Sequence, residues 1–132
     1  EANAVGPGKR PLSSMTPTLV KKDGKLFLVL GSPGGPTIIN TVLNVLSNVV
    51  DLDLDIQAAV DAPRYHHQWI PDLIRAERGG LSTSAQAALR KRGYRIEFRD
   101  QIGDAHCIMV EPATGIYLGA PDPRSESKAS GY

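Results

Sequence analysis

The chain has 132 residues, which suits one domain or a large part of one. Hydrophobic residues make up 41% and charged residues 22%, a composition that excludes an intrinsically disordered chain and fits a packed globular one. Lys and Arg number 15 against 14 Asp and Glu, so the charge gives no reason to expect nucleic acid or an anionic membrane as a partner.

Residues 1–15 show no hydrophobic periodicity. Gly6, Pro7, Gly8 and Pro11 predict an extended or looped arm that cannot form a core. No charged stretch followed by an apolar one is present here, so we expect no signal peptide in this segment. An arm of this kind at residue 1 suggests a chain cut from a longer polypeptide.

Two apolar runs, 18–22 and 25–31, flank Asp23 and Gly24. That arrangement predicts a β-hairpin with a tight turn. The second run, Leu26 to Leu30, is apolar on both faces of a strand. We therefore expect other layers to cover it on both sides.

Residues 37–50 carry apolar side chains at helical spacing and predict a helix. The opposite face is polar but has no charge, whereas an ordinary surface helix carries Lys or Glu there. Either this face is weakly solvated, or a layer or subunit outside the chain covers it. The polar residues are Asn40, Thr41, Asn44, Ser47 and Asn48.

The rest of the chain predicts shorter elements. A helix over 55–62 stops at Pro63, an extended segment follows over 65–69, and Gly93 ends a helix that begins with the capping-box spacing of Thr83 to Gln86. Residues 94–99 alternate as in a half-buried strand, and runs at 107–110 and 116–118 predict a second hairpin. Five or six strands and three helices in an antiparallel or mixed arrangement indicate the α+β class.

Gly31 to Gly35 lies between the two-sided strand and the long helix. Backbone N–H groups at a helix N-terminus attract negative charge, and glycine allows close approach to the backbone. Such a turn can bind a phosphate or stabilise an oxyanion, although no Walker sequence follows. The alternative is a strand-to-helix turn that only requires positive φ angles.

Other residues could carry chemistry, but ordinary roles explain most of them. His66 and His67 are adjacent on an extended segment, so they point to opposite faces and cannot chelate one ion. The cations at 90–92, with Arg95 and Arg99, fit a solvated helix end. Cys107 lies in an apolar run and fits a buried thiol. The hydroxyls of Ser13 and Ser14 could donate to a carboxylate or simply belong to a loop.

Longer blocks of sequence resemble the gamma-glutamyltranspeptidase (glutathione hydrolase) family. The resemblance covers nearly the whole chain, and the blocks follow in the family's order. They run from Lys9 to Thr18 (KRPLSSMTPT), Gly31 to Gly35 (GSPGG), Asp61 to Trp69 (DAPRYHHQW) and Asp122 to Arg124 (DPR).

This resemblance implies an N-terminal-nucleophile hydrolase, in which helical layers enclose two sheets in an αββα sandwich. The chain would be the C-terminal portion of the small subunit. Its complete enzyme would move the gamma-glutamyl group of glutathione to water or to an amino-acid or peptide acceptor, through an acyl-threonine. By resemblance, Ser13 and Ser14 hold the donor's alpha-carboxylate, and the N–H groups of Gly34 and Gly35 form the oxyanion hole.

The family's nucleophilic threonine and its large-subunit arginine do not match any residue of these 132. Thr16, Thr18, Thr37 and Thr41 are internal and have no free amine, so we expect the isolated chain to be inactive. The expected partners are the remainder of the same enzyme and a small gamma-glutamyl donor. We expect no metal, cofactor, nucleic acid or membrane segment, and the resemblance implies a periplasmic or secreted enzyme.

Two alternatives remain open at this point. The chain could belong to a relative that acts on poly-gamma-glutamate or on a glutaryl side-chain amide. It could also be a stand-alone binding or structural domain of the same ancestry. The donor, the acceptor, the balance of hydrolysis and transfer, and the oligomeric state do not follow from the sequence.

Overall fold

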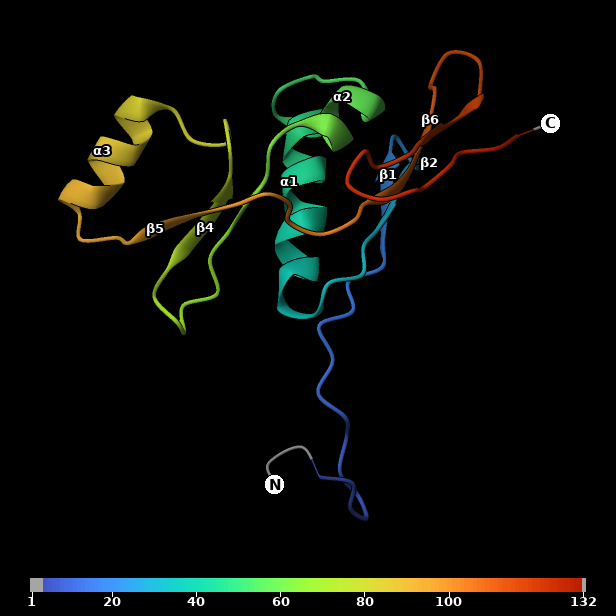
Figure 1. The fold of residues 1–132 in the computed structure, drawn as a ribbon. Coiled ribbons are helices and arrows are strands. Elements are labelled where there is room, and N and C mark those ends of the chain that lie inside the picture. The colour runs from blue at the N-terminus through green and yellow to red at the C-terminus, as the bar shows by residue number, and fades with distance from the viewer. Residues whose placement is uncertain (1–3, 132) are drawn as a thin grey trace.

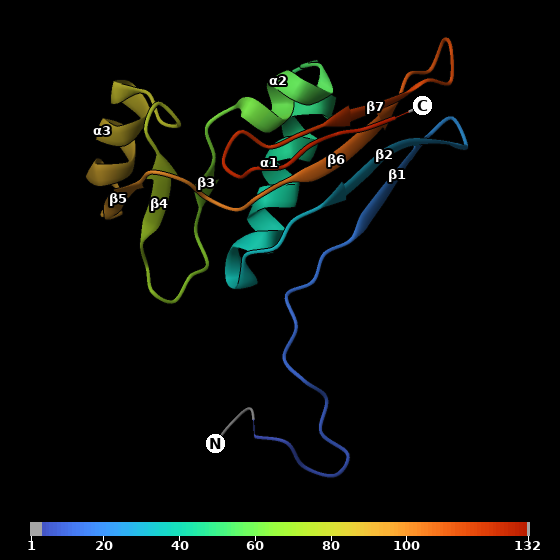
Figure 2. The ribbon, with the colours of Figure 1, turned by 45° about the vertical axis from the view of Figure 1, so that its right-hand side comes forward.

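The computed structural model describes residues 4–131 and shows an α+β fold with two sheets (Figure 1). The strand order is β1-β2-β6-β7 in the larger sheet and β3-β4-β5 in the smaller one. Helix α1 stands between the two sheets in both views (Figures 1 and 2). The elements are β1 (Thr18–Lys22), β2 (Lys25–Gly31), α1 (Ile38–Val50), α2 (Ile56–Asp61), β3 (Tyr65–His66), β4 (Ile74–Glu77), α3 (Thr83–Lys91), β5 (Ile96–Arg99), β6 (His106–Val110) and β7 (Tyr117–Ala120).

The segment before β1 is an arm. Residues 4–17 contain no helix or strand, and in both ribbon views the arm leads away from the two sheets (Figure 2). Residues 1–3 of the predicted arm lie outside the described residues. The arm nevertheless passes the C-terminal end of β2, where Ser14 makes a contact described below.

The predicted first hairpin is confirmed with the expected bounds. Asp23 and Gly24 have φ angles of 52° and 78°. A two-residue turn with two positive φ angles matches the twist of the strands that it joins. Strands β1 and β2 pair antiparallel, with a shift in register between Val20 and Lys21.

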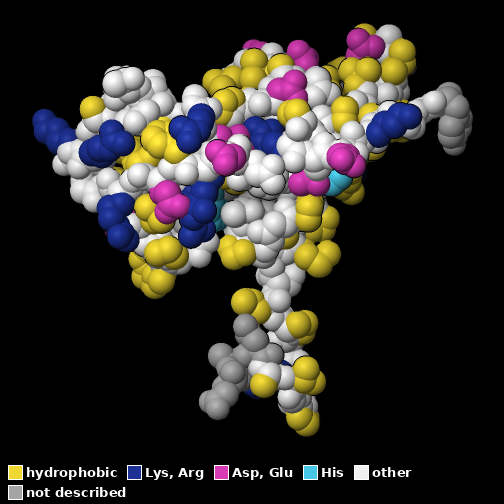
Figure 3. Space-filling model, viewed as in Figure 1, with side chains coloured by type: hydrophobic (Ala, Val, Ile, Leu, Met, Phe, Trp, Pro, Cys, Tyr) yellow, Lys and Arg dark blue, Asp and Glu magenta, His cyan; other side chains and the backbone are white. Residues whose placement is uncertain are grey.

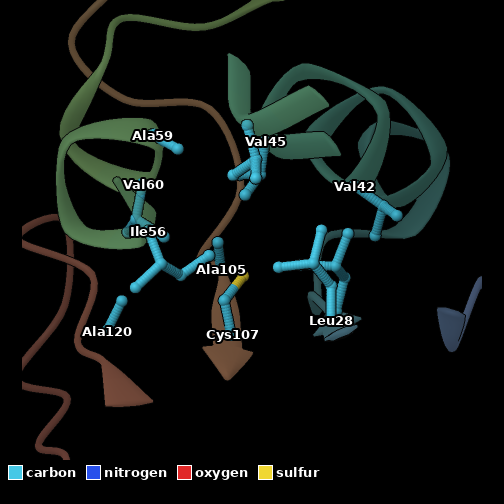
Figure 4. Packing of buried hydrophobic residues seen from close by; sticks show 11 residues of the cluster. Leu28, Val42, Val45, Ile56, Ala59, Val60, Ala105, Cys107 and Ala120 are labelled. Atoms are coloured by element: carbon cyan, nitrogen blue, oxygen red, sulfur yellow. The ribbon is translucent and has the colours of Figure 1, made fainter. Parts of the chain in front are cut away.

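One hydrophobic core lies between the larger sheet and the helices α1 and α2 (Figure 4). Leu28 and Leu30 of β2 are 0% and 2% exposed, because alternate residues of the strand face α1. Val45 of α1 and Val60 of α2 are both fully buried. Burial of one such side chain contributes about 1.5–3 kcal/mol. Packing therefore holds the end of β2 rigidly against α1.

The second hairpin is also confirmed, and it joins the first. Strand β6 pairs antiparallel with β2 on one side and with β7 on the other. The turn between β6 and β7 contains Gly115 with a φ angle of 76°. The larger sheet is thus two hairpins side by side.

The smaller sheet contains a strand that the sequence patterns did not predict. Strand β4 pairs antiparallel with β3 and parallel with β5, and α3 forms the connection between β4 and β5. The described residues therefore form seven strands rather than five or six, and the arrangement is mixed. Helix α3 ends before Gly93 as predicted, but its N-cap is Ser82, whose side chain accepts a hydrogen bond from the Ala85 N–H.

The polar face of α1 is covered by this chain itself. Asn44 donates to the Tyr65 carbonyl at 3.1 Å and accepts from the Tyr65 N–H at 3.2 Å. Asn48 donates to the Ala59 carbonyl, and Thr41 is fully buried. The expectation that solvent or a missing neighbour covers this face is wrong, because β3 and α2 fold back onto it.

Among the described residues no helix covers the outer face of the larger sheet, and the C-terminal segment lies over part of it, where Ala129 is close to Gly119 of β7. The row across β1, β2 and β6 contains Leu19, Val29 and Ile108, which point away from α1. Leu19 is 71% exposed and Ile108 39%. Within residues 4–131, no helix is long and apolar enough to cross a membrane.

Candidate functional site

The glycine turn (Gly34 and Gly35) connects β2 to α1 through a short 3₁₀ segment, Gly35–Thr37. Its φ angles are 130° and 57°, a region in which most L-residues are strained. A Cβ atom on Gly34 would lie 2.6 Å from Thr37 Oγ1, whereas a Cβ atom on Gly35 would meet nothing within 4 Å. Gly34 is therefore required by packing, while Gly35 faces open space.

Both carbonyl groups of the glycine turn are held in place. Thr37 donates to the Gly34 carbonyl through its N–H at 3.2 Å and its hydroxyl at 2.9 Å. Ile38 donates its N–H to the Gly35 carbonyl. In the described part of the chain, neither the Gly34 nor the Gly35 N–H donates a hydrogen bond, and both residues are exposed. The turn thus presents two backbone donors beside a helix N-terminus, a suitable environment for developing negative charge.

The serine pair reaches this turn. Ser14 Oγ donates to the Gly35 carbonyl at 2.7 Å, across 21 residues of sequence. Ser13 Oγ accepts a hydrogen bond from the Met15 N–H at 3.2 Å. The structure therefore brings together Ser14 and Gly35, two of the residues that sequence reasoning singled out independently.

The loop at residues 102–105, which sequence reasoning missed, supports the glycine turn. Ser32 Oγ donates to the Pro33 carbonyl at 2.6 Å and accepts from the Asp104 N–H at 3.2 Å. Gly103 has a φ angle of 68°, and a Cβ atom there would overlap Thr41 Oγ1. The sequence signal for this contact was weak, a single glycine in a polar loop between two strands.

Beside this loop lies a buried network of two arginines and two carboxylates. Arg64 and Asp122, both fully buried in their side chains, form an ion pair at 2.7 Å. Arg124 forms a two-pronged pair with Glu77, at 2.6 and 2.5 Å, and also contacts Asp122 at 3.1 Å. Glu77 further accepts from the Ile102 N–H at 2.6 Å, and Asp122 from the Ala105 N–H at 2.5 Å. The network therefore fixes both ends of the loop that supports the glycine turn.

The network keeps its carboxylates charged. Burial alone would raise the pKa of Glu77, but hydrogen bonds from Arg124 and from the Arg64 and Ile102 N–H groups lower the pKa below its usual value. Burial likewise opposes ionisation of Asp122, yet hydrogen bonds from the Ala105 and Arg124 N–H groups and the Arg64 ion pair lower its pKa. The pKa of Arg124 is raised, because its two carboxylate partners outweigh the effect of burial.

Comparisons with known proteins show the family of this chain. The family model for gamma-glutamyltranspeptidase matches residues 1–132. This chain belongs to the gamma-glutamyltranspeptidase family. It is 49% identical to the glutathione hydrolase proenzyme of Escherichia coli over 133 aligned residues, which cover all of this chain and 23% of that protein. The chain thus spans about a quarter of the length of this curated relative.

Solved structures support the same fold. A Helicobacter pylori gamma-glutamyltranspeptidase mutant, T380A, matches with a TM-score of 0.86 and 49% identity, over 95% of this chain and 68% of that one. Cephalosporin acylase from Bacillus halodurans matches with a TM-score of 0.81 and 26% identity, over 98% of this chain and 25% of that one. The predicted α+β class and N-terminal-nucleophile hydrolase fold are confirmed.

The remaining candidates in this gamma-glutamyltranspeptidase chain have separate surroundings. His66 is 1% exposed and lies between Asn40 and Gln68, at 2.6 and 2.8 Å, whereas His67 contacts Asp72 at 3.0 Å. The two histidines therefore face different partners, as their adjacency predicted. Burial raises the pKa of the Cys107 thiol to about 11, so the group is a protonated core side chain.

The basic cluster and a hollow between the hairpin turns lie away from the glycine turn. Lys and Arg side chains gather over α3 in Figure 3, where Arg90, Lys91 and Arg92 are exposed at the end of the helix. A hollow between the two hairpin turns includes Lys22, Phe27 and Glu111. Because Asp23 and Gly24 precede β2 and the glycine turn follows it, the hollow and the glycine turn lie at opposite ends of the strand.

Proposed function

We propose that this chain is the C-terminal portion of the small subunit of an enzyme that transfers a gamma-glutamyl group from glutathione or a related donor. Water or an amino-acid or peptide acceptor receives the group through an acyl-threonine. The remainder of the enzyme supplies that threonine and completes the donor site. The family relationship and the 49% identity to a glutathione hydrolase support this proposal. By the same relationship we propose a periplasmic or secreted location.

The observation that carries the proposal is the contact between Ser14 and Gly35. In a gamma-glutamyl group, three carbons separate the alpha-carboxylate from the gamma-carbonyl. A site that holds both must place a carboxylate contact within a few ångströms of an oxyanion hole. The 2.7 Å hydrogen bond from Ser14 to the Gly35 carbonyl supports such an arrangement.

The proposed chemistry follows from the glycine turn. When threonine attacks the gamma-carbonyl, its oxygen gains negative charge. Open N–H groups of Gly34 and Gly35 would stabilise that oxygen more in the transition state than in the ground state, which accelerates the reaction. Ser13 and Ser14 would orient the donor through its carboxylate.

The test uses the complete protein with a gamma-glutamyl p-nitroanilide. Replacing Ser13 and Ser14 together by Ala should lower kcat/KM, because each hydrogen bond to a carboxylate is worth about 1.5–3 kcal/mol, or roughly tenfold or more. Thr18→Val is a suitable control, since it removes a hydroxyl-to-carbonyl hydrogen bond, to Thr16, that does not involve the glycine turn. An unchanged kcat/KM in the double variant would remove the serine pair from the site.

A second candidate function rests on the match to cephalosporin acylase. In that case the physiological group would be a glutaryl or poly-gamma-glutamyl amide. The lower identity, 26% against 49%, makes it the second choice. Side-by-side turnover of gamma-glutamyl and glutaryl p-nitroanilides by the complete protein separates the two, and lack of turnover with either donor would favour a non-catalytic domain.

A further inference from the structure

We propose that Ser32 and Thr37 are positioning residues for the oxyanion hole, and that each aims one of its two N–H groups. Ser32 sets the direction of the Gly34 N–H, and Thr37 sets that of the Gly35 N–H. This inference rests on the proposed function, because it concerns the same glycine turn. The two hydroxyl groups act through the peptide bonds of the turn, so their effect is on the rate of acyl transfer rather than on donor affinity.

The argument begins with the geometry of the peptide bond. In a planar trans peptide, the C=O of one residue and the N–H of the next point in opposite directions. The Pro33 carbonyl therefore sets the direction of the Gly34 N–H, and the Gly34 carbonyl sets that of the Gly35 N–H. Glycine has no Cβ to restrict its rotation. The hydrogen bonds of these two carbonyl groups thus decide where the two N–H groups point.

Ser32 holds the first of these peptides. Its Oγ donates to the Pro33 carbonyl at 2.6 Å and accepts from the Asp104 N–H at 3.2 Å. Because a hydroxyl carries one proton, the Asp104 contact uses a lone pair and leaves that proton for the carbonyl. Asp104 belongs to the loop at 102–105, which the buried network of arginines and carboxylates holds at both ends. Ser32 is thereby kept in the orientation that aims the Gly34 N–H.

Thr37 holds the second peptide. It occupies the N-cap position of α1, where a threonine side chain usually accepts a hydrogen bond from a helix N–H. The Thr37 side chain makes no such capping bond, and its Oγ1 donates to the Gly34 carbonyl at 2.9 Å. The fully buried Thr41 fixes Thr37 in turn, because its Oγ1 donates to the Thr37 carbonyl at 3.0 Å. The Thr37 hydroxyl therefore serves the glycine turn rather than the helix.

The two peptides differ in the number of donors that hold them. Among residues 4–131, Ser32 Oγ is the only group that donates to the Pro33 carbonyl. The Gly34 carbonyl also accepts from the Thr37 N–H at 3.2 Å, a contact that remains when the Thr37 hydroxyl is removed. We therefore expect loss of the Ser32 hydroxyl to have the larger effect.

The experiment measures kcat and KM of the complete enzyme with a gamma-glutamyl p-nitroanilide. Ser32→Ala should lower kcat by about 10- to 100-fold, less than complete removal of an oxyanion donor, and Thr37→Val should lower it by a smaller factor. KM should change little, because neither hydroxyl belongs to the proposed carboxylate site. Ser32→Thr and Thr37→Ser keep the hydroxyl groups and should restore most of kcat.

Thr114→Ala is the matched control for Ser32→Ala. The Thr114 hydroxyl also makes two hydrogen bonds within a turn, since it donates to the Glu111 carboxylate and accepts from the Ile116 N–H at 3.2 Å. This turn joins β6 to β7 and lies away from the glycine turn. The control variant should therefore keep the kcat of the wild type.

A second measurement separates aim from folding. The inhibitor is a donor analogue in which a boronic acid replaces the gamma-carboxyl group. The threonine oxygen gives an electron pair to boron while its hydroxyl proton passes to a base, and boron becomes a tetrahedral anion that imitates the transition state. The inhibition constant should rise in Ser32→Ala in proportion to the fall in kcat/KM. A smaller fraction of folded enzyme would lower kcat and leave this constant unchanged.

The outcomes are distinct. An unchanged inhibition constant in Ser32→Ala, or a normal kcat, would show that Ser32 does not aim the Gly34 N–H, and the inference would be wrong. If Ser32→Ala does not fold, Thr37→Val gives the same comparison, since it removes no capping bond from α1. Lack of turnover by the wild-type enzyme would instead reject the proposed function.

Discussion

Gly34 and Gly35 are neighbours that both have positive φ angles, yet their surroundings differ. A side chain on Gly34 would collide with Thr37 Oγ1, whereas Gly35 has open space where a side chain would begin. Substitution at Gly34 therefore disturbs the packing of the turn itself. Substitution at Gly35 disturbs mainly the approach of a substrate and the aim of the N–H group.

This difference makes Gly35→Val the sharper probe of the oxyanion hole. In the complete enzyme we expect kcat to fall by roughly 100- to 1,000-fold, the usual effect of losing one oxyanion donor of about 2.7–4 kcal/mol. A left-handed backbone costs a non-glycine residue about 1–2 kcal/mol, so some stability is lost as well. Steady-state kinetics and thermal unfolding measure the two effects separately.

Gly24→Val is the matched control for this prediction. Gly24 has a φ angle of 78° and equally open surroundings, but it lies in the β1–β2 turn at the other end of β2. It should lose similar stability while kcat stays close to normal. A folded Gly35→Val enzyme with normal kcat would show that the glycines serve only the fold.

Among the elements, those with local determinants were predicted well. The first hairpin follows from Asp23 and Gly24, and Gly93 marks the end of α3, because these residues favour left-handed conformations. Strand β4 was missed because its register depends on pairing with β5, some 20 residues away. The cap of α3 was misplaced by one residue, since Ser82 and Thr83 both suit the position.

The polar face of α1 illustrates a different limit. Asn44 pairs with both backbone groups of Tyr65, as a residue of a neighbouring strand would. Sequence periodicity showed an uncharged face but gave no indication that β3, 21 residues later, would cover it. The contact depends on tertiary folding rather than on the composition of the helix.

We expect Asn44→Ala to destabilise the complete protein by about 1–3 kcal/mol, because the Tyr65 backbone groups lose their partner at a buried position of α1. Ser47→Ala is the control within the same helix, since the described structure gives the Ser47 side chain no hydrogen bond. Chemical denaturation of the two variants measures the difference. Equal stability of Asn44→Ala and Ser47→Ala would mean that water replaces the lost contacts.

At the scale of the whole molecule, the buried charge network connects segments that are far apart in sequence. Arg64, Glu77, Asp122 and Arg124 join the end of α2, the end of β4, the loop at 102–105 and the segment after β7. The resemblance drew attention to residues 61–69 and 122–124, but gave no role for Asp122. Only the folded chain shows that these blocks contact each other.

The network predicts a pH-dependent contribution to stability. The pKa values of Glu77 and Asp122 are lowered in the folded state, so their contribution is fully present above the unfolded pKa values and is lost as the pH falls through the folded ones. We expect Asp122→Asn to cost about 3–5 kcal/mol near pH 7, because it leaves a buried arginine without its charge partner. This cost should shrink as the pH falls below the unfolded pKa of about 3.9, because the unfolded wild-type carboxylate then binds a proton that the folded one does not bind.

Thermal unfolding of the wild type and of Asp122→Asn, as complete proteins between pH 3 and pH 7, tests this pH dependence. The expected destabilisation near pH 7 is about 3–5 kcal/mol. Asp100→Asn is the control, since Asp100 is 96% exposed in its side chain and lies 3.9 Å from Arg78, so it should have little effect at any pH. A cost of Asp122→Asn that stays constant with pH would indicate lost shape complementarity rather than lost charge.

The outer face of the larger sheet has a practical consequence for handling residues 1–132 as a separate polypeptide. Leu19, Ile108 and Tyr117 would meet water there, and β1 and β7 are edge strands. Apolar sheet faces and unpaired strand edges promote contact between identical molecules. Expression yield, colloidal behaviour and the choice of fusion partner would therefore depend on this apolar face.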